Sequence, residues 1–99
     1  MTDPAVFREQ LDTIFLVDLD SRSIPLRLTE VTEVPPTSGL LQFSLFFHGP
    51  SDRVLEQGLY DLRHEALGSL SLFIVPVVGS NADRIVYQAC FSLRVPPSE

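Results

Sequence analysis

The sequence has few of the residues that stabilise or catalyse by special chemistry. It contains a single cysteine, Cys90, so no disulfide can form within the chain, and no group of cysteines and histidines indicates structural zinc. The lack of disulfides fits a reducing compartment, although a secreted domain without disulfides would look the same. There is no tryptophan, but there are seven phenylalanines. Stability must therefore come from packing of aromatic and aliphatic side chains.

Lysine is absent, and the seven arginines are dispersed along the chain. Thirteen acidic residues outnumber them and give a formal net charge of −6. Binding to a phosphate backbone or an anionic membrane surface requires clustered cations, so this balance argues against nucleic acid and membrane partners. The apolar run at 70–78 is too short to span a bilayer, and the first ten residues do not resemble a signal peptide. We therefore expect a soluble, cytoplasmic protein.

What the sequence does contain is a series of short segments in which apolar and polar residues alternate. In the clearest one, Leu41, Phe43, Leu45 and Phe47 form a single apolar row. Strands are predicted at 13–19, 24–34, 40–48, 59–64, 69–76 and 84–94.

One helix is predicted before these strands, over about residues 4–11, with Asp3 as its N-cap and Pro4 in its first turn. The connections between strands are too short for helical crossovers. The sequence thus predicts a single domain over residues 1–99. We expect a mainly β fold, a small and mostly antiparallel barrel or sandwich of about six strands with one short N-terminal helix.

Irregular points are also predicted. The alternation changes phase between Leu28 and Val31, which indicates a β-bulge near Thr29 and Glu30. The segment 35–39 is predicted as a loop because consecutive prolines cannot donate to a ladder, and 49–52 is predicted to end the preceding strand.

The fold is expected to be organised around residues 57–76. Within this stretch, 65–68 is predicted as one tight helical turn, which Gly68 closes in a left-handed conformation. In the strand that follows, the second half carries apolar residues on both parities, including Phe73, so we expect burial on both faces.

The two histidines are candidates for chemistry. His48 and His64 both follow apolar strands, and with Asp52, Asp61 or Glu65 they could form a metal or acid–base site. Their spacing matches no known ligand motif. The alternative, which we favour, is that each is a strand-end residue whose ring nitrogen binds a nearby backbone group.

Other reactive side chains carry weaker signals. Cys90 has no neighbouring base in the sequence and is interpreted as a small apolar residue within a strand, and Ser44 lacks the motif of a nucleophilic serine. Tyr60 and Tyr87 are expected to anchor the core with their hydroxyls at its edge. Tyr60 could also line a binding groove with Gln57 and His64. We predict no catalytic residue, metal site or cofactor.

The central stretch resembles a known pattern. Gln57-Gly58-Leu59-Tyr60, His64, Leu67-Gly68 and the strand at 72–77 are similar to a small bacterial family of domains of unknown function. Its members read QG-x-Y-x-x-x-H-x-x-L-G before an LFLVPV-like strand. Asp12 stands where this pattern has a glycine after the helix. Members often accompany proteins that resemble phage-tail collar components, and the resemblance therefore implies a structural or assembly role.

Three functions remain open at this point. The first is a non-catalytic protein-interaction or assembly module that forms oligomers or binds a protein partner, because Phe46, Phe73 and Val86 lie on faces that alternation leaves less buried. The alternative is a β-barrel that binds a small ligand at a mouth formed by Tyr60, Gln57 and His64. An enzyme, the third, would require a histidine paired with a carboxylate in a cleft, and we expect the chain not to be one.

Overall fold

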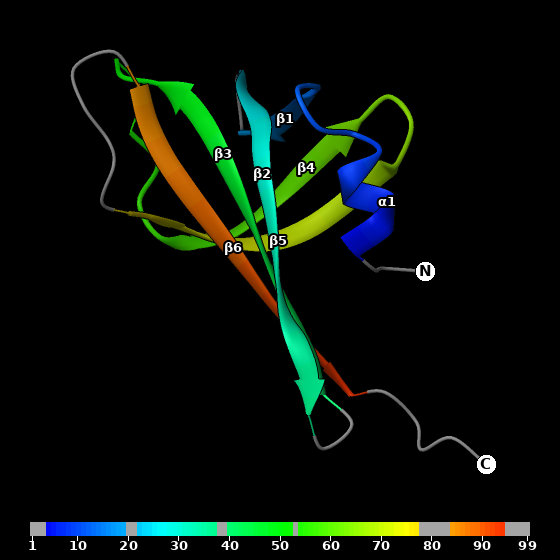
Figure 1. Cartoon of the computed structure of the whole chain (residues 1–99). Helices are drawn as coiled ribbons and strands as arrows, with labels where there is room; N and C mark the ends of the chain where they lie inside the picture. Colours follow the sequence, from blue (N-terminus) through cyan, green and yellow to red (C-terminus); the bar gives the residue numbers. More distant parts are fainter. Residues whose placement is uncertain (1–3, 20–21, 38–39, 53, 78–83, 95–99) are drawn as a thin grey trace.

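The computed structural model describes residues 4–19, 22–37, 40–52, 54–77 and 84–94. In this part of the chain one short helix precedes six strands (Figure 1). Their bounds are α1 Pro4–Arg8, β1 Ile14–Asp18, β2 Ser23–Thr37, β3 Leu40–Pro50, β4 Gly58–His64, β5 Gly68–Pro76 and β6 Arg84–Arg94. The strands pair antiparallel and close into a barrel in the order β1-β2-β3-β6-β5-β4. The predicted fold class is confirmed, and of the two architectures that the sequence left open the structure shows the barrel.

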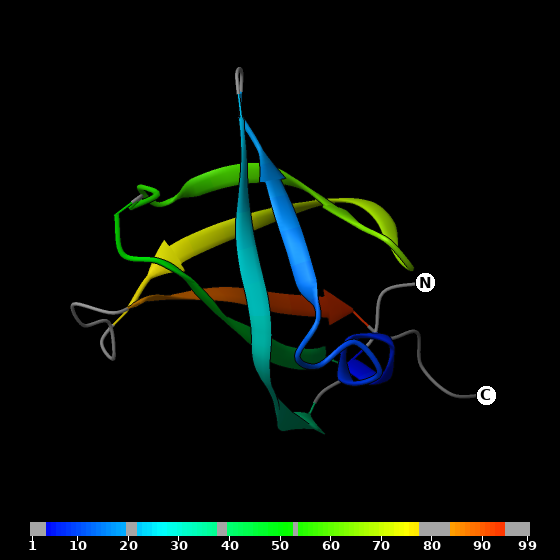
Figure 2. The same cartoon turned by 90° about the horizontal axis from the view of Figure 1, so that it is seen from above.

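The ladders that make up the barrel differ greatly in length. β3 and β6 pair along their whole length, from Leu40 opposite Arg94 to Pro50 opposite Arg84. By contrast, β1 meets β4 over two residue pairs, and β5 meets β6 over two. We refer to these two short ladders as the β1–β4 junction and the β5–β6 junction. In Figure 2, β1 crosses β4 at a steep angle, so these two neighbours diverge quickly, and in Figure 1 β6 crosses β5 obliquely.

The long strands β2, β3 and β6 continue past the barrel as a three-stranded extension (Figure 1), and the molecule measures 49 × 27 × 23 Å. Two bulges bend β2 along the way, each adding one residue to β2 relative to β3. The first is at Thr29, between the pairs that Leu28 and Glu30 make, and confirms the bulge predicted from the change of phase. It returns Val31 to the buried face, with 6% exposure.

Two predicted strand ends were placed too early. Pro35 and Pro36, predicted as loop, lie within β2 at its second bulge, where the register shifts between Val34 and Thr37. A bulge on an edge strand accommodates prolines because it requires fewer donors from the backbone. Likewise, Gly49 and Pro50 belong to β3 and pair with the first residues of β6. Ser38 and Gly39, the rest of the predicted loop, lie outside the described residues.

The N-terminal helix is shorter than predicted. α1 ends at Arg8 rather than near residue 11, and tighter backbone bonds follow, from the N–H of Gln10 to Phe7 and from that of Leu11 to Arg8. At Asp12 the backbone adopts φ 67°, the left-handed conformation that ends a helix and favours the glycine of the resembling pattern. The predicted cap Asp3 lies outside the described residues. With five residues, α1 cannot cross a membrane, and the described chain has no other helix.

Side chains fill the barrel interior. Phe7 from α1 closes one end, with its ring centroid 6.0 Å from that of Phe43 and 5.7 Å from that of Phe91. Phe43 and Phe91, paired across β3 and β6, stack at 4.6 Å. The largest side chains with under 2% exposure are Tyr87, Phe7, Phe15, Phe43, Phe47, Leu26, Leu28, Leu45, Leu62, Ile74 and Val17.

The β4–β5 hairpin differs from its prediction at two points. Glu65 to Leu67 form a three-residue turn, not a helical element, and Gly68 follows in the predicted left-handed conformation at φ 77°. The second half of β5 is buried on one face only. Leu72 and Ile74 point inward, but Phe73 is 53% exposed, because α1 packs against β2 and leaves the outer face of β5 uncovered.

Candidate functional site

His64 lies at the end of β4 beside the β1–β4 junction and is 8% exposed. The backbone N–H groups of Ala66 and Leu67 donate to its Nδ1, at 2.9 and 3.2 Å. Its Nε2 lies 2.8 Å from Oγ1 of Thr13, a residue 51 positions earlier in the chain. The ring also contacts that of Phe15, with centroids 4.3 Å apart. One side chain thus holds the turn after β4 and the start of β1 together.

The hydrogen bonds determine the protonation state of this ring. Since Nδ1 accepts from two N–H groups, the proton must be on Nε2, which donates to the Thr13 hydroxyl. That hydroxyl in turn donates to the carbonyl of Gln10 at 2.6 Å. Burial lowers the pKa of His64, and the carboxylate of Glu65 opposes this in part. Both ring nitrogens are engaged, so the favoured interpretation of His64 as a backbone-bonded strand-end residue is confirmed.

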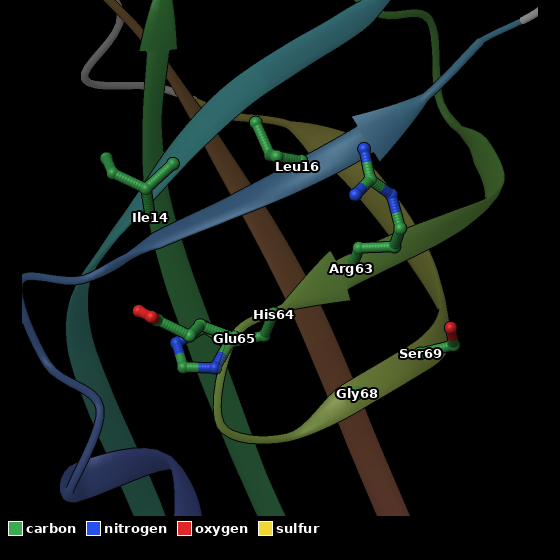
Figure 3. Close-up of a pocket in the computed structure, with 7 residues that line it drawn as sticks. All are labelled: Ile14, Leu16, Arg63, His64, Glu65, Gly68 and Ser69. Atoms are coloured by element: carbon green, nitrogen blue, oxygen red, sulfur yellow. The ribbon is translucent and has the colours of Figure 1, made fainter.

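A hollow of about 440 Å³ opens next to His64 (Figure 3). Ile14 and Leu16 of β1 line one side, and Arg63, Glu65 and Ser69 belong to the hairpin opposite. In Figure 3 the side chains of Arg63 and His64 leave β4 in different directions. Arg63 binds Asp18 at 2.6 Å and holds the pKa of that carboxyl below its usual value. The positive charge of Arg63 is therefore neutralised by Asp18 within the chain.

The other residues that the sequence grouped with His64 lie elsewhere. Asp61 accepts a hydrogen bond from Ser71 at 2.9 Å on the outer face of the hairpin, and Asp52 is exposed. No group of three or more potential metal ligands occurs among the described residues. The hollow beside His64 does not include the other residues considered for a binding groove: Tyr60 and Gln57 are near the start of β4, about 13 Å or more along the strand from His64.

His48 lies in a second hollow, of about 380 Å³, on the outer side of β2, β3 and β6. Arg27 and Arg84 line it as well. Burial lowers the pKa of His48, and the positive charges of Arg84 and Arg27 lower it further. These three cationic or titratable groups are far apart in the sequence, where the arginines appear dispersed. The register gathers them, because Arg27 is opposite His48 and Arg84 is opposite Pro50, two residues along β3.

The remaining candidates have structural roles. Tyr87 is fully buried, and its hydroxyl accepts a hydrogen bond from the N–H of Leu55 at 2.8 Å, as expected for a core anchor. Gly49 allows this packing, since a Cβ there would lie 2.9 Å from the Tyr87 ring and 2.7 Å from Leu26. Tyr60 is half-buried and donates to the carbonyl of Glu56.

Cys90 lies within a strand, as predicted, but its side chain is not buried. It is exposed on the outer face of β6, where the hydroxyl of Ser44 lies 3.5 Å from its sulfur. Val86, predicted to be less buried, is 8% exposed, because its outward position lies in the row that includes His48 and Arg27. Phe46 is half-buried.

Two exposed large apolar residues are neighbours on the β4–β5 hairpin. Leu59 is 70% exposed and Phe73 is 53% exposed, and the two are direct partners across the ladder. Sequence alternation indicated Phe73 but not Leu59. The exposure of Leu59 could have been predicted from the hairpin register. Once the three-residue turn is known, the register places Leu59 opposite Phe73.

Of the three comparisons with known proteins, the one with family models found a match. The family model described as a domain of unknown function, DUF6916, matches residues 3–91. The chain belongs to the DUF6916 family. The matched region extends from before α1 to Phe91 near the end of β6, so it includes both hollows and the exposed hairpin pair. Neither the curated proteins nor the solved structures gave a match.

Proposed function

We propose that this DUF6916 domain is a non-catalytic protein-interaction or assembly module that docks through the outer face of the β4–β5 hairpin. The Leu59–Phe73 pair carries the proposal, because two large apolar side chains are exposed side by side on a rigid ladder. Exposed apolar groups of this kind mark interfaces, and aromatic anchors often dominate their binding energy.

The surroundings of this pair support a docking role. On the same face the next two positions are polar pairs, Asp61 with Ser71 and then Arg63 with Ser69. Asp61 and Ser71 are hydrogen-bonded to each other, and Arg63 is held by Asp18. An apolar centre beside fixed polar groups has the composition of a protein interface with its rim.

The proposed partner is a second copy of the chain, since two-fold association places each Leu59–Phe73 pair against its own equivalent. An assembly role also agrees with the resemblance to domains that accompany phage-tail collar-like proteins. A ligand inside the barrel has less support, because large side chains fill the interior. A catalytic histidine has less support as well, because both nitrogens of His64 are engaged. A cytoplasmic location stays a prediction.

The test is molar mass by light scattering over a concentration series. We expect the mass of the wild-type chain to rise from monomer towards dimer, and Phe73→Ser to shift the midpoint to at least about tenfold higher concentration. Val54→Ser is the matched control, because Val54 is also exposed, at 60%, but lies outside the hairpin. A strict monomer at the highest concentration, or equal effects of the two substitutions, would contradict self-association through this face.

A further inference from the structure

The hollow around His48 has an unusual composition for this chain. Its lining includes Arg27, Arg84 and His48, and none of the described residues that line it is acidic. The chain as a whole carries a formal net charge of −6, with thirteen acidic residues against seven arginines. Among the described residues, this concave region thus presents guanidinium groups and no carboxylate, in contrast to the net negative charge of the chain.

The register of the barrel builds this arrangement from four strands. Ile14 of β1, Arg27 of β2, His48 of β3 and Val86 of β6 are successive partners across the sheet. Arg84 is two residues before Val86 and therefore points to the same side of β6. Because the groups are on ladder positions and not on loops, their spacing is fixed by the backbone.

Arg27 differs from other arginines of the described chain in its partners. Arg8 binds Glu33 at 2.8 Å and Arg63 binds Asp18 at 2.6 Å, but Arg27 has no ion-pair partner among the described residues. Arg84 already interacts with another group of the chain. Arg27 is therefore the donor that is most available, and its charge already acts on His48 across the hollow.

The rest of the lining is apolar. Pro25 and Pro50 belong to it, and so does Ile14, which is 46% exposed. A bare inorganic anion would gain nothing from such walls, whereas the apolar part of an organic molecule would be partly removed from water against them. Guanidinium groups in turn match the geometry of carboxylate and phosphate oxygens.

We propose that this hollow binds a small organic oxyanion, in which a carboxylate or phosphate monoester is carried on an apolar body. The oxyanion contacts Arg27 and Arg84, and the apolar body lies against Ile14 and the two prolines. A nucleic acid is a poorer fit, because the chain carries a net charge of −6 and the cationic lining belongs to one small hollow. The site lies on other strands than the Leu59–Phe73 pair, so the two proposals can fail independently.

The test is a titration of the ¹⁵N-labelled chain followed by NMR at low ionic strength. The probes are benzoate and phenyl phosphate, which distinguish a carboxylate from a phosphate head group. The controls are inorganic phosphate, which has the charged group without the apolar body, and benzyl alcohol, which has the apolar body without the charge. We expect saturable shifts at the amides of Arg27, His48 and Arg84 with at least one organic anion, at an affinity at least about fivefold above that for either half.

Variants assign the binding to the arginines. Arg27→Gln should weaken the organic anion about tenfold, the loss typical of a charge-assisted hydrogen bond. Arg22→Gln, which removes the same charge from an exposed residue outside the hollow, should change the affinity less than about twofold. The ¹⁵N spectrum of each variant reports whether it is folded. The proposal is overturned by absence of saturable shifts, by shifts centred elsewhere, by inorganic phosphate binding as tightly as the organic anions, or by equal losses in the two variants.

Discussion

His64 and Tyr87 are two buried polar side chains at opposite ends of β5. His64 is paired with Gly68, the first residue of β5, and Tyr87 is paired with Pro76, the last. Each lies next to one of the junctions where the barrel closes over two residue pairs, and each binds backbone groups from a neighbouring segment. Beside each short ladder, a buried side chain thus binds a segment from elsewhere in the chain.

The two side chains differ in how many groups they hold and in their response to pH. The Tyr87 hydroxyl satisfies a single N–H, that of Leu55, whereas the His64 ring satisfies two N–H groups and the Thr13 hydroxyl. Burial raises the pKa of Tyr87 above 10, so its phenol stays neutral near pH 7. Burial lowers the pKa of His64, whose ordinary value of 6.5 lies within the accessible range. We therefore expect the β1–β4 junction to be stronger at neutral pH but more sensitive to acid.

The largest predicted effect is that of removing the imidazole. His64→Ala leaves two N–H groups without their acceptor and a cavity beside Phe15, and should lower the free energy of unfolding by about 4 kcal/mol. Urea denaturation at pH 7.5 measures it. His64→Asn, whose side-chain oxygen can accept in place of Nδ1, should recover about half of the loss. If the alanine variant lost less than His48→Ala, the role assigned to His64 would be wrong.

A smaller effect is predicted at the β5–β6 junction. Tyr87→Phe keeps the packed ring but leaves the buried N–H of Leu55 unsatisfied, which should cost about 2 kcal/mol in the same denaturation assay. Tyr60→Phe is the matched control, because its hydroxyl binds the exposed carbonyl of Glu56, and we expect a loss of about 0.5 kcal/mol or less. Equal losses in the two variants would show that the buried bond from Leu55 to Tyr87 adds no more stability than the exposed one.

The smallest effect, and the one that separates the junctions, is the response to pH. Because the pKa of His64 is lower in the folded chain than in the unfolded chain, the unfolded state binds the proton first, and stability falls as pH drops below about 6.5. Unfolding free energies at pH 7.5 and 5.0 should therefore differ, by less than the loss in His64→Ala at neutral pH. The lowered pKa of His48 acts in the same direction, so His48→Asn is measured alongside.

The contribution of His64 is the part of this pH dependence that disappears in His64→Asn and persists in Tyr87→Phe. Asp18, whose pKa is also lowered, contributes stability above its ordinary value of 3.8 and loses it below, outside the chosen interval. An unchanged pH dependence in His64→Asn would place the titrating group elsewhere and remove the contrast between the junctions.

Local patterns in the sequence predicted much of the fold. Alternation located the strands, and the change of phase after Leu28 located a bulge, because side-chain parity reports directly which face of a strand is buried. Gly68 was predicted in its left-handed conformation for a similar reason, since that requirement is local. The extension of β2 through its prolines was missed because it depends on β3 as a partner.

The candidate sites were less accessible to sequence reasoning because their partners are distant. Thr13 meets His64 across 51 residues, and Arg27 meets His48 and Arg84 through the pairing of three strands. The arginines appeared dispersed because spacing along a chain does not report spacing across a sheet. The same limit explains Leu59, whose exposure follows from its place opposite Phe73.

The extension of β2 beyond the barrel has a consequence for aggregation. Past Leu28, no described strand pairs with the outer edge of β2, and a bare edge is a template for intermolecular cross-β pairing. Glu30 and Glu33 put charge on this strand, and Pro35 and Pro36 remove two donors near its end. Together with the bulges, these residues make the edge a poor template, so the domain can expose a long strand to other copies of itself without polymerising along it.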